Sequence, residues 1–197
     1  MRGCFQPLFL SQLFNTMKTN ITLCPIQPAT TEVERATTLY MNSFPECERR
    51  ELREWTALLT QSNKSFMVYA IKAQNNFTGF ISCWDFDDFI YVEHFAIDPS
   101  TRGNGIGGTA IQALAAHYST QPLVLEVEPP TNDIAIRRIH FYERQGFFIS
   151  NTPYLQPPYR KGDEWFELKL MCTDIHFLDQ NIETIQQIIY KNVYGVK

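Results

Sequence analysis

The sequence predicts a mixed α/β (α+β) domain, with a seven-stranded sheet that is antiparallel in its first half and flanked by helices. Two features of the 197-residue chain support this prediction. Between residues 65 and 98, three runs rich in β-branched and aromatic residues are separated by polar turns, which is typical of an antiparallel meander. A glycine-rich run then lies between a strand pattern and a helix pattern, which indicates a strand–loop–helix crossover.

Composition limits the classes of protein that the chain can be. Its length suits one domain with a sizeable core, and 44% of its residues are hydrophobic. The net charge is −4 and no basic patch stands out, so nucleic acid is not an expected partner. No apolar run has the length of a membrane span, and we expect no membrane partner. The five cysteines lack metal or redox spacing, which favours reduced thiols in a cytoplasmic protein and predicts no metal site.

The first twenty residues are expected to be a loose extension. Their apolar residues are interrupted by polar ones, and they show no clear signal-peptide cleavage site. A second methionine, Met17, lies just before the first strand pattern, so residues 1–16 are a candidate upstream extension. We therefore place the domain at residues 21–172 and a helical tail, packed on the same domain, at residues 173–197.

The elements follow in order from the hydrophobic patterns. A strand is expected at residues 21–25, a helix at 29–44 and, after Pro45, a second helix at 46–61. Trp55 in the second helix is expected to belong to the core rather than to a substrate site. Further strands are expected at 65–73, 77–86, 89–98, 122–128, 147–150 and 164–172. Further helices are expected at 105–118, 133–145 and 179–194, the last packing on the core or, alternatively, forming a homodimer.

The glycine-rich run predicts an anion-binding loop. It lies at the start of a helix and consists of Arg102, Gly103, Asn104, Gly105, Ile106, Gly107 and Gly108. Glycines let the backbone approach a ligand, and the helix start offers free N–H groups to a phosphate. No Walker-type Gly-Lys-Ser/Thr is present, whereas a Gly-x-Gly-x-x-Gly match keeps a dinucleotide-binding loop open as an alternative.

Two motifs in order resemble the GNAT-type N-acetyltransferase superfamily. Arg102-x-x-Gly105-x-Gly107 is similar to the acyl-CoA loop of that superfamily, and residues 141–147 resemble a later family motif with a tyrosine, Tyr142. The resemblance covers roughly residues 21 to 170. It implies a GNAT-like fold, with a V-shaped splay between strands four and five that holds acetyl-CoA as co-substrate. It also implies direct transfer of the acetyl group to a primary amine of a small molecule, or less favoured a peptide, without a covalent enzyme intermediate.

The resemblance also implies roles for individual residues. The backbone of Phe95, Ala96 and Ile97 would pair with the pantetheine arm of acetyl-CoA. Tyr142 would return a proton to the departing thiolate, and Glu93 is the candidate base. His94 alternates with Glu93 along the strand, so it is predicted to face the other side as a structural histidine.

The amine substrate is expected to meet acidic and aromatic groups. Glu126 and Glu128, on one face of their strand, are candidate substrate-binding residues and rival bases, and Phe44 is a further candidate contact. Asp85, Asp87 and Asp88 add to an acidic character that would suit a cationic amine if these groups face the cleft. The proline- and tyrosine-rich loop at residues 151–163 is expected to close over the acceptor.

The sequence departs from the family pattern at one position, and one alternative function stays open. Many family members carry an asparagine seven residues before the tyrosine, where this chain has Ala135, so that contact to the cofactor is in doubt. The alternative is a non-catalytic acyl-CoA-binding or regulatory module on the same fold.

Overall fold

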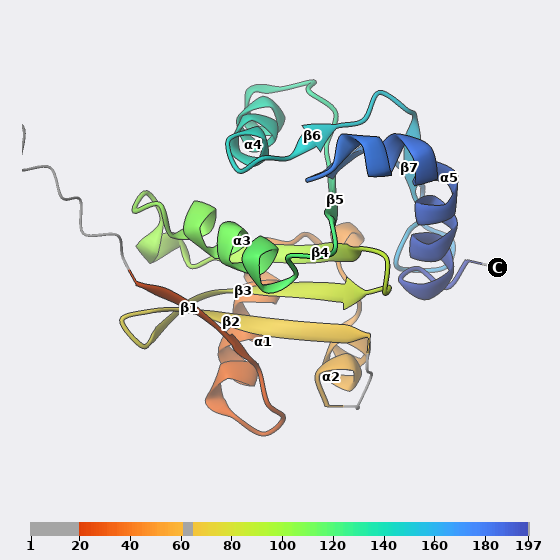
Figure 1. The fold of residues 1–197 in the computed structure, drawn as a ribbon. Coiled ribbons are helices and arrows are strands. Elements are labelled where there is room, and N and C mark those ends of the chain that lie inside the picture. Colours follow the sequence, from red (N-terminus) through yellow and green to blue (C-terminus); the bar gives the residue numbers. More distant parts are fainter. Residues whose placement is uncertain (1–19, 61–64, 197) are drawn as a thin grey trace, which may run out of the picture.

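The structure is a computed structural model that describes residues 20–60 and 65–196 (Figure 1). Its eight strands run in the order β1-β2-β3-β4-β5-β8-β6, and β7 pairs with β8 beside this path. The strands are β1 (Ile21–Pro25), β2 (Phe66–Ala73), β3 (Asn76–Asp85), β4 (Ile90–Ile97), β5 (Leu123–Val127), β6 (Phe148–Ile149), β7 (Tyr154–Gln156) and β8 (Phe166–Cys172). The predicted extension before the first strand lies outside the described residues, except for Asn20.

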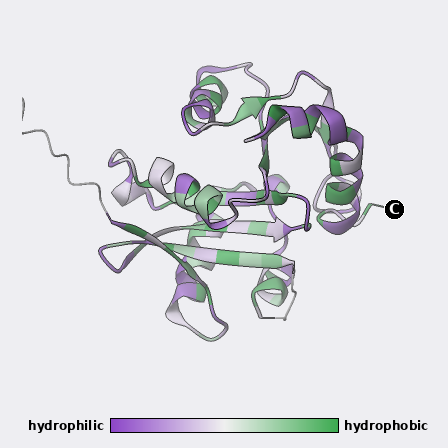
Figure 2. Cartoon of the chain, viewed as in Figure 1, coloured by the Kyte–Doolittle hydropathy of each residue, from purple (hydrophilic) through white to green (hydrophobic). Residues whose placement is uncertain are grey.

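The helices cover both faces of the sheet and enclose two hydrophobic cores. They are α1 (Thr31–Ser43), α2 (Leu52–Thr60), α3 (Ile106–His117), α4 (Asp133–Glu143) and α5 (Ile175–Asn192). Side chains of α1, α2 and α5 enter one core, and those of α3 and α4 enter the other. Successive strand residues alternate between the cores, so Phe80 belongs to the first and Ile81 to the second. Figure 2 shows the hydrophobic residues along the central strands.

The splay between β4 and β5 is confirmed. These parallel strands pair only from Ile90–Leu123 to Val92–Leu125, and beyond that point they diverge. On the other edge of β4, antiparallel pairing with β3 passes from Cys83–Val92 directly to Ser82–His94. Glu93 is therefore the extra residue of a β-bulge at the point where the strands part.

The expected second helix at residues 46–61 is wrong in its first half. Glu46–Glu48 forms a short 3-10 turn, and α2 begins only at Leu52. The intervening link is extended and held by side chains: the Arg49 guanidinium Nε donates to the Phe44 carbonyl at 3.0 Å. The Arg50 N–H likewise donates to the Tyr40 hydroxyl at 2.7 Å. The predicted last residue of this helix, Gln61, lies outside the described part of the chain.

Two further boundaries differ from expectation near the C-terminus. The expected loop at residues 151–163 contains β7, where buried Tyr154 and Gln156 flank an exposed Leu155. The tail helix begins at Ile175, because the Asp174 carboxylate caps it by accepting the Phe177 N–H at 3.0 Å. The core position of Trp55 is confirmed, since its fully buried ring stacks on Tyr40 at 4.1 Å between centroids. Among the described helices, none is long and apolar enough to cross a membrane.

Candidate active site

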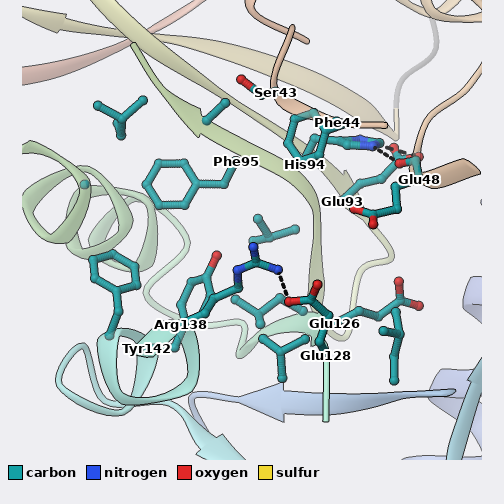
Figure 3. A pocket seen from close by; sticks show the side chains of 18 of the residues that line it. Ser43, Phe44, Glu48, Glu93, His94, Phe95, Glu126, Glu128, Arg138 and Tyr142 are labelled. Atoms are coloured by element: carbon teal, nitrogen blue, oxygen red, sulfur yellow. Dashed lines mark hydrogen bonds and ion pairs between the residues drawn. The ribbon is translucent and has the colours of Figure 1, made fainter. Parts of the chain in front are cut away.

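A cleft of about 770 Å³ lies where β4 and β5 separate (Figure 3). Both strands, the loop before α3, and α4 contribute to its walls. Every predicted site residue except Asn104 lines it: Phe44, Glu93, Phe95, Ala96, Ile97, Arg102, Gly103, Gly105, Ile106, Gly107, Gly108, Glu126, Glu128 and Tyr142. Sequence reasoning missed Glu48 of the 3-10 turn, Arg138 of α4 and Glu167 of β8, whereas Gln156 and Tyr159 belong to the segment 151–163 that was expected at the acceptor.

The β4 wall is formed by residues beyond the last β4–β5 pair. Phe95, Ala96 and Ile97 remain bonded to β3, so their other backbone edge borders the cleft. Close approach of β3 and β4 requires Gly79, because a Cβ there would lie 2.4 Å from the Ala96 carbonyl oxygen. The exposed edge can pair with an extended amide-containing arm as another strand would.

The glycine loop has the backbone conformation of an anion site. Gly103 and Gly105 have φ of +87° and +72°, a region that favours glycine, and Gly105 is the N-cap of α3. Gly107 lies against ring atoms of Phe141 and Phe95, where a Cβ would be in contact at 3.5 and 3.6 Å. The first N–H groups of α3, a twelve-residue helix, thus face the cleft end where a phosphate would be favoured.

Arg102 contributes a fixed positive charge to this loop. Its Nε donates to the Ile97 carbonyl at 3.0 Å, which anchors the guanidinium beside the end of β4. The preceding turn is held by Asp98, whose carboxylate accepts the Ser100 N–H at 2.9 Å. Asp98 therefore caps the short 3-10 turn Pro99–Thr101 that leads into the loop.

Tyr142 projects from α4 toward the cleft (Figure 3). Its ring packs between Phe141 and Phe147, and 9% of the residue is exposed. Its hydroxyl has no hydrogen-bond partner among the described residues. Burial raises the pKa of this tyrosine to about 12, so the hydroxyl keeps its proton near neutral pH and can donate it. Asn132 does not replace the missing family asparagine at Ala135, because its side chain caps α4.

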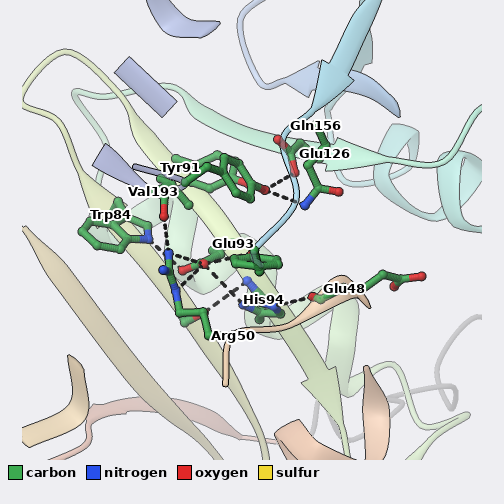
Figure 4. A network of polar contacts seen from close by, with 12 residues as sticks. Glu48, Arg50, Trp84, Tyr91, Glu93, His94, Glu126, Gln156 and Val193 are labelled. Carbon is green, nitrogen blue, oxygen red and sulfur yellow. Dashed lines mark hydrogen bonds and ion pairs between the residues drawn. The ribbon is translucent and has the colours of Figure 1, made fainter. Parts of the chain in front are cut away.

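Glu93 is the centre of a buried polar network (Figure 4). Its side chain is 1% exposed, and Arg50 Nη2 lies 2.9 Å from its Oε1. The Tyr159 hydroxyl donates to the same oxygen at 3.0 Å, and Trp84 Nε1 donates to Oε2 at 2.7 Å. Burial alone would raise the pKa of this carboxyl, but Arg50 and these donors outweigh it and hold the pKa below its ordinary value. Glu93 is therefore ionised, anchored and a weak base.

The prediction that His94 faces away from Glu93 is wrong. The bulge breaks the alternation of β4, and His94 Nδ1 lies 3.9 Å from Glu93 Oε1. His94 Nε2 lies 3.1 Å from the Glu48 carbonyl oxygen, which only accepts hydrogen bonds, so we assign the proton to Nε2. Burial lowers the pKa of the imidazole and keeps it neutral. Nδ1 is then an unprotonated atom with no hydrogen-bond partner among the described residues.

Glu126 has a different environment from Glu93. It follows the last β5 residue paired with β4 and lines the cleft. The Tyr154 hydroxyl donates to its Oε1, and the Tyr194 hydroxyl donates to Oε2 at 2.8 Å. Burial raises the pKa of this carboxyl to about 7, with the negative charge of Glu93 acting in the same direction and the tyrosine hydroxyls opposing it. Glu126 therefore exchanges a proton near neutral pH.

Only some of the acidic residues that the sequence suggested for the cleft line it. Its acidic lining residues are Glu48, Glu93, Glu126, Glu128 and Glu167, whereas Asp85, Asp87 and Asp88 do not line it. Glu128 forms an ion pair with Arg138 of α4. Asp85 instead lies beside the start of β4, at the opposite end of that strand from the splay. Its carboxylate accepts a hydrogen bond from the Gln121 amide nitrogen at 2.8 Å.

The expected lid is part of the cleft wall. Tyr154 is 2% exposed and bonded to Glu126, and the Tyr159 hydroxyl is bonded to Glu93. The Arg50 guanidinium lies over the Tyr159 ring at 5.1 Å. These contacts hold the segment inward, so in this structure its tyrosines support the two carboxylates rather than cover the entrance.

Comparisons with known proteins agree with this geometry. The model of the acetyltransferase (GNAT) family matches residues 30–147. A solved GNAT-family protein from Bacteroides thetaiotaomicron, named as an acetyltransferase by inference, is 36% identical with a TM-score of 0.82, over 89% of this chain and 99% of that one. A GNAT-family acetyltransferase from Elizabethkingia anophelis, solved with acetyl-CoA bound, is 20% identical with a TM-score of 0.52, over 79% and 98%, which shows a shared fold.

A shorter similarity links the chain to a curated protein. YjbC of Bacillus subtilis (strain 168), also named as an acetyltransferase by inference, is 37% identical over 65 residues. This match spans 32% of the present chain and 33% of the length of YjbC.

Proposed function

Because this chain belongs to the acetyltransferase (GNAT) family and is an acetyl-CoA-dependent acyltransferase, we propose that it acetylates a primary amine of a small cationic molecule. The amine attacks the thioester directly, and no covalent enzyme intermediate forms. The observation that carries the proposal is that one cleft contains an anion-binding helix start, an open strand edge and a protonated tyrosine. These are the three contacts that a pyrophosphate, a pantetheine arm and a departing thiolate need.

Acetyl-CoA binds along the wall formed by β4 and the start of α3. The N–H groups after Gly105 bind the pyrophosphate, with the charge of Arg102 beside them. The open backbone edge at residues 95–97 pairs with the amides of the pantetheine arm and delivers the thioester to the centre of the splay. A backbone N–H of the same edge donates to the oxyanion that forms when the amine attacks.

Glu126 accepts the proton of the amine. A general base works best when its pKa is near the working pH, and the pKa of Glu126 is raised to about 7. Glu93, the base first expected, is held ionised by the paired Arg50 guanidinium, and its pKa lies below the ordinary value. We therefore assign Glu93 to anchoring the bulge and Glu126 to proton transfer.

Tyr142 supports the departure of CoA. The thiolate that leaves is stabilised by a neighbouring donor, and the Tyr142 hydroxyl is protonated and unpartnered among the described residues. The atoms balance: the amine nitrogen bonds to the acetyl carbon to give the oxyanion, which then collapses as the carbon–sulfur bond breaks. Glu126 takes one proton from the amine nitrogen, and sulfur takes the hydroxyl proton of Tyr142. Tyr142 regains a proton from solvent, to which Glu126 releases its own.

A cationic acceptor suits the charges around the remaining space. Five glutamates of the described residues line the cleft; Glu93 is paired with Arg50 and Glu128 with Arg138. Arg102 lies in the loop that receives the phosphates and Arg138 is paired with Glu128, so the carboxylates of Glu48 and Glu167 remain to attract a second positive charge on the substrate. Small polyamines and amines with a distal ammonium group fit this description.

The test measures CoA thiol release with acetyl-CoA and a panel containing a polyamine, a neutral alkylamine, an amino acid and a short peptide. We expect the polyamine to give the highest kcat/KM. Tyr142→Phe should lower kcat with little change in acetyl-CoA affinity, and Tyr118→Phe, whose hydroxyl bonds to Tyr69 outside the cleft, is the matched control. Tight acetyl-CoA binding without thiol release from any amine would instead favour a non-catalytic acyl-CoA-binding module.

A further inference from the structure

We propose that Val193 and Tyr194, the two residues after α5, are positioning residues of the active site, holding the Arg50–Glu93 pair and Glu126 in place from behind the cleft wall. This inference rests on the proposed acetyl transfer. Both residues lie outside residues 30–147, which the family model matches. It gives the C-terminal helix a role beyond packing on the core.

The first contact runs through Val193. Its carbonyl oxygen accepts a hydrogen bond from Arg50 Nη2 at 2.7 Å (Figure 4). The same Nη2 lies 2.9 Å from Glu93 Oε1, and Arg50 Nε donates to that oxygen at 3.1 Å. A guanidinium is rigid and planar, so fixing Nη2 on Val193 fixes the direction in which Nε meets Glu93. The end of α5 thereby sets the position of the bulge at which β4 leaves β5.

The second contact runs through the Tyr194 hydroxyl. It donates to Glu126 Oε2 at 2.8 Å and accepts from Gln156 Nε2 at 2.7 Å. The Tyr91 hydroxyl lies 3.2 Å away, and the Tyr194 ring lies 5.0 Å from the Tyr159 ring between centroids. Gln156 and Tyr159 line the cleft, whereas Tyr194 lies one layer behind them. Tyr194 therefore touches the proposed base from the side opposite to the substrate.

The chain end is built to keep these residues in place. Val193 is 3% exposed within the core that includes Ile185 and Ile189. After Tyr194 the backbone reverses at Gly195, whose φ is +69°, and the Val196 N–H returns to the Tyr190 carbonyl at 2.9 Å. This closed helix end fixes the direction of the Tyr194 side chain.

The expected consequence is a change in the protonation of Glu126. The groups facing Glu126 are Tyr91 and Glu93 of β4, Tyr154 of β7, Tyr159 of the following loop, and Tyr190 and Tyr194 of the C-terminal segment. Among these, Tyr194 donates a hydrogen bond that favours the ionised carboxylate and holds its pKa down. Loss of that bond should raise the pKa of Glu126 and move the acidic limb of the rate profile to higher pH.

The experiment compares wild type, Tyr194→Phe and Tyr190→Phe. Tyr190 is the matched control, because it lies in the last turn of α5, four residues before Tyr194, and its hydroxyl donates to the Leu155 carbonyl rather than to a carboxylate. The proton equilibrium of Glu126 is followed directly by the carboxyl ¹³C shift in protein labelled at glutamate, with the signal assigned by its absence in Glu126→Gln. The pH profile of kcat/KM is measured on the same proteins.

We expect Tyr194→Phe to raise the midpoint of the Glu126 titration by about one pH unit, and the acidic limb of the kcat/KM profile to move with it. At pH values below this midpoint, kcat/KM should fall by up to about tenfold. Acetyl-CoA affinity should be unchanged, and Tyr190→Phe should match wild type. An unmoved Glu126 titration in Tyr194→Phe overturns this inference while leaving acetyl transfer standing. A moved titration in a protein that acetylates no amine upholds the contact and overturns the proposed function instead.

Discussion

Replacing Glu126 by glutamine should change how the stability of the protein depends on pH. Burial raises the pKa of this carboxyl from an ordinary 4.5 to about 7 in the folded chain. Between these two values the unfolded chain releases a proton that the folded chain keeps, so the free energy of unfolding of wild type falls as pH rises. Glutamine does not titrate, so this fall in the free energy of unfolding is absent from the variant.

The magnitude follows from the size of the pKa difference. Roughly two and a half pKa units at about 1.4 kcal/mol each give about 3 kcal/mol. Glu126 is only partly buried, and solvent screening reduces the expected value to roughly 2 kcal/mol. The free energy of unfolding of the variant, relative to that of wild type, should therefore rise by about 2 kcal/mol between pH 4.5 and pH 8.

Urea unfolding at a series of pH values measures this difference. Glu167→Gln, the same substitution at an exposed carboxyl on β8, controls for the removal of one negative charge. Contributions from other groups, such as the low pKa of Glu93, are present in both proteins and cancel to first order. A stability difference between Glu126→Gln and wild type that stays constant from pH 4.5 to pH 8 would refute the assignment of a raised pKa, and with it the choice of Glu126 as base.

Three further substitutions test the supports of the cleft. Arg50→Met leaves the buried Glu93 carboxylate without its cation and should destabilise the fold by about 3 kcal/mol in urea unfolding; a loss below 1 kcal/mol would contradict a buried pair. Gly79→Ala places a Cβ against the Ala96 carbonyl and should cost about 2 kcal/mol, whereas Gly107→Ala, which meets only ordinary contacts, should cost little. Gly105→Val forces a β-branched residue to a φ of +72° and should weaken acetyl-CoA binding in calorimetry at least about tenfold; unchanged affinity would remove this loop from the cofactor site.

Local patterns predicted the fold and the cofactor wall well. Strand alternation, the glycines at 103–108 and the spacing of Tyr142 from the loop are all properties of short stretches, and the expected residues line one cleft. The resemblance to a family supplied the splay, which no local pattern contains. The long second helix was mispredicted because the contacts that keep its first half extended, such as Arg50 to Tyr40, are tertiary.

The environments of Glu93 and Glu126 could not be predicted from the sequence. Alternation separated Glu93 from His94, but a one-residue bulge reverses that inference and is invisible without the register of the neighbouring strand. Glu93 and Glu126 look equivalent in sequence, yet one meets Arg50 and the other meets Tyr194, each contributed by a distant segment. The tail was expected to pack on the core, and nothing in its isoleucine pattern indicated that Tyr194 reaches the cleft wall.

The most direct test of the account is a calorimetric titration of the purified protein with acetyl-CoA, with NAD as the control ligand. We expect micromolar binding of acetyl-CoA at one site per chain, weakened by Gly105→Val, and no heat from NAD. Binding of NAD without binding of acetyl-CoA would contradict it, because the glycine loop would then serve a dinucleotide and the roles given to Tyr142 and Glu126 would lose their basis.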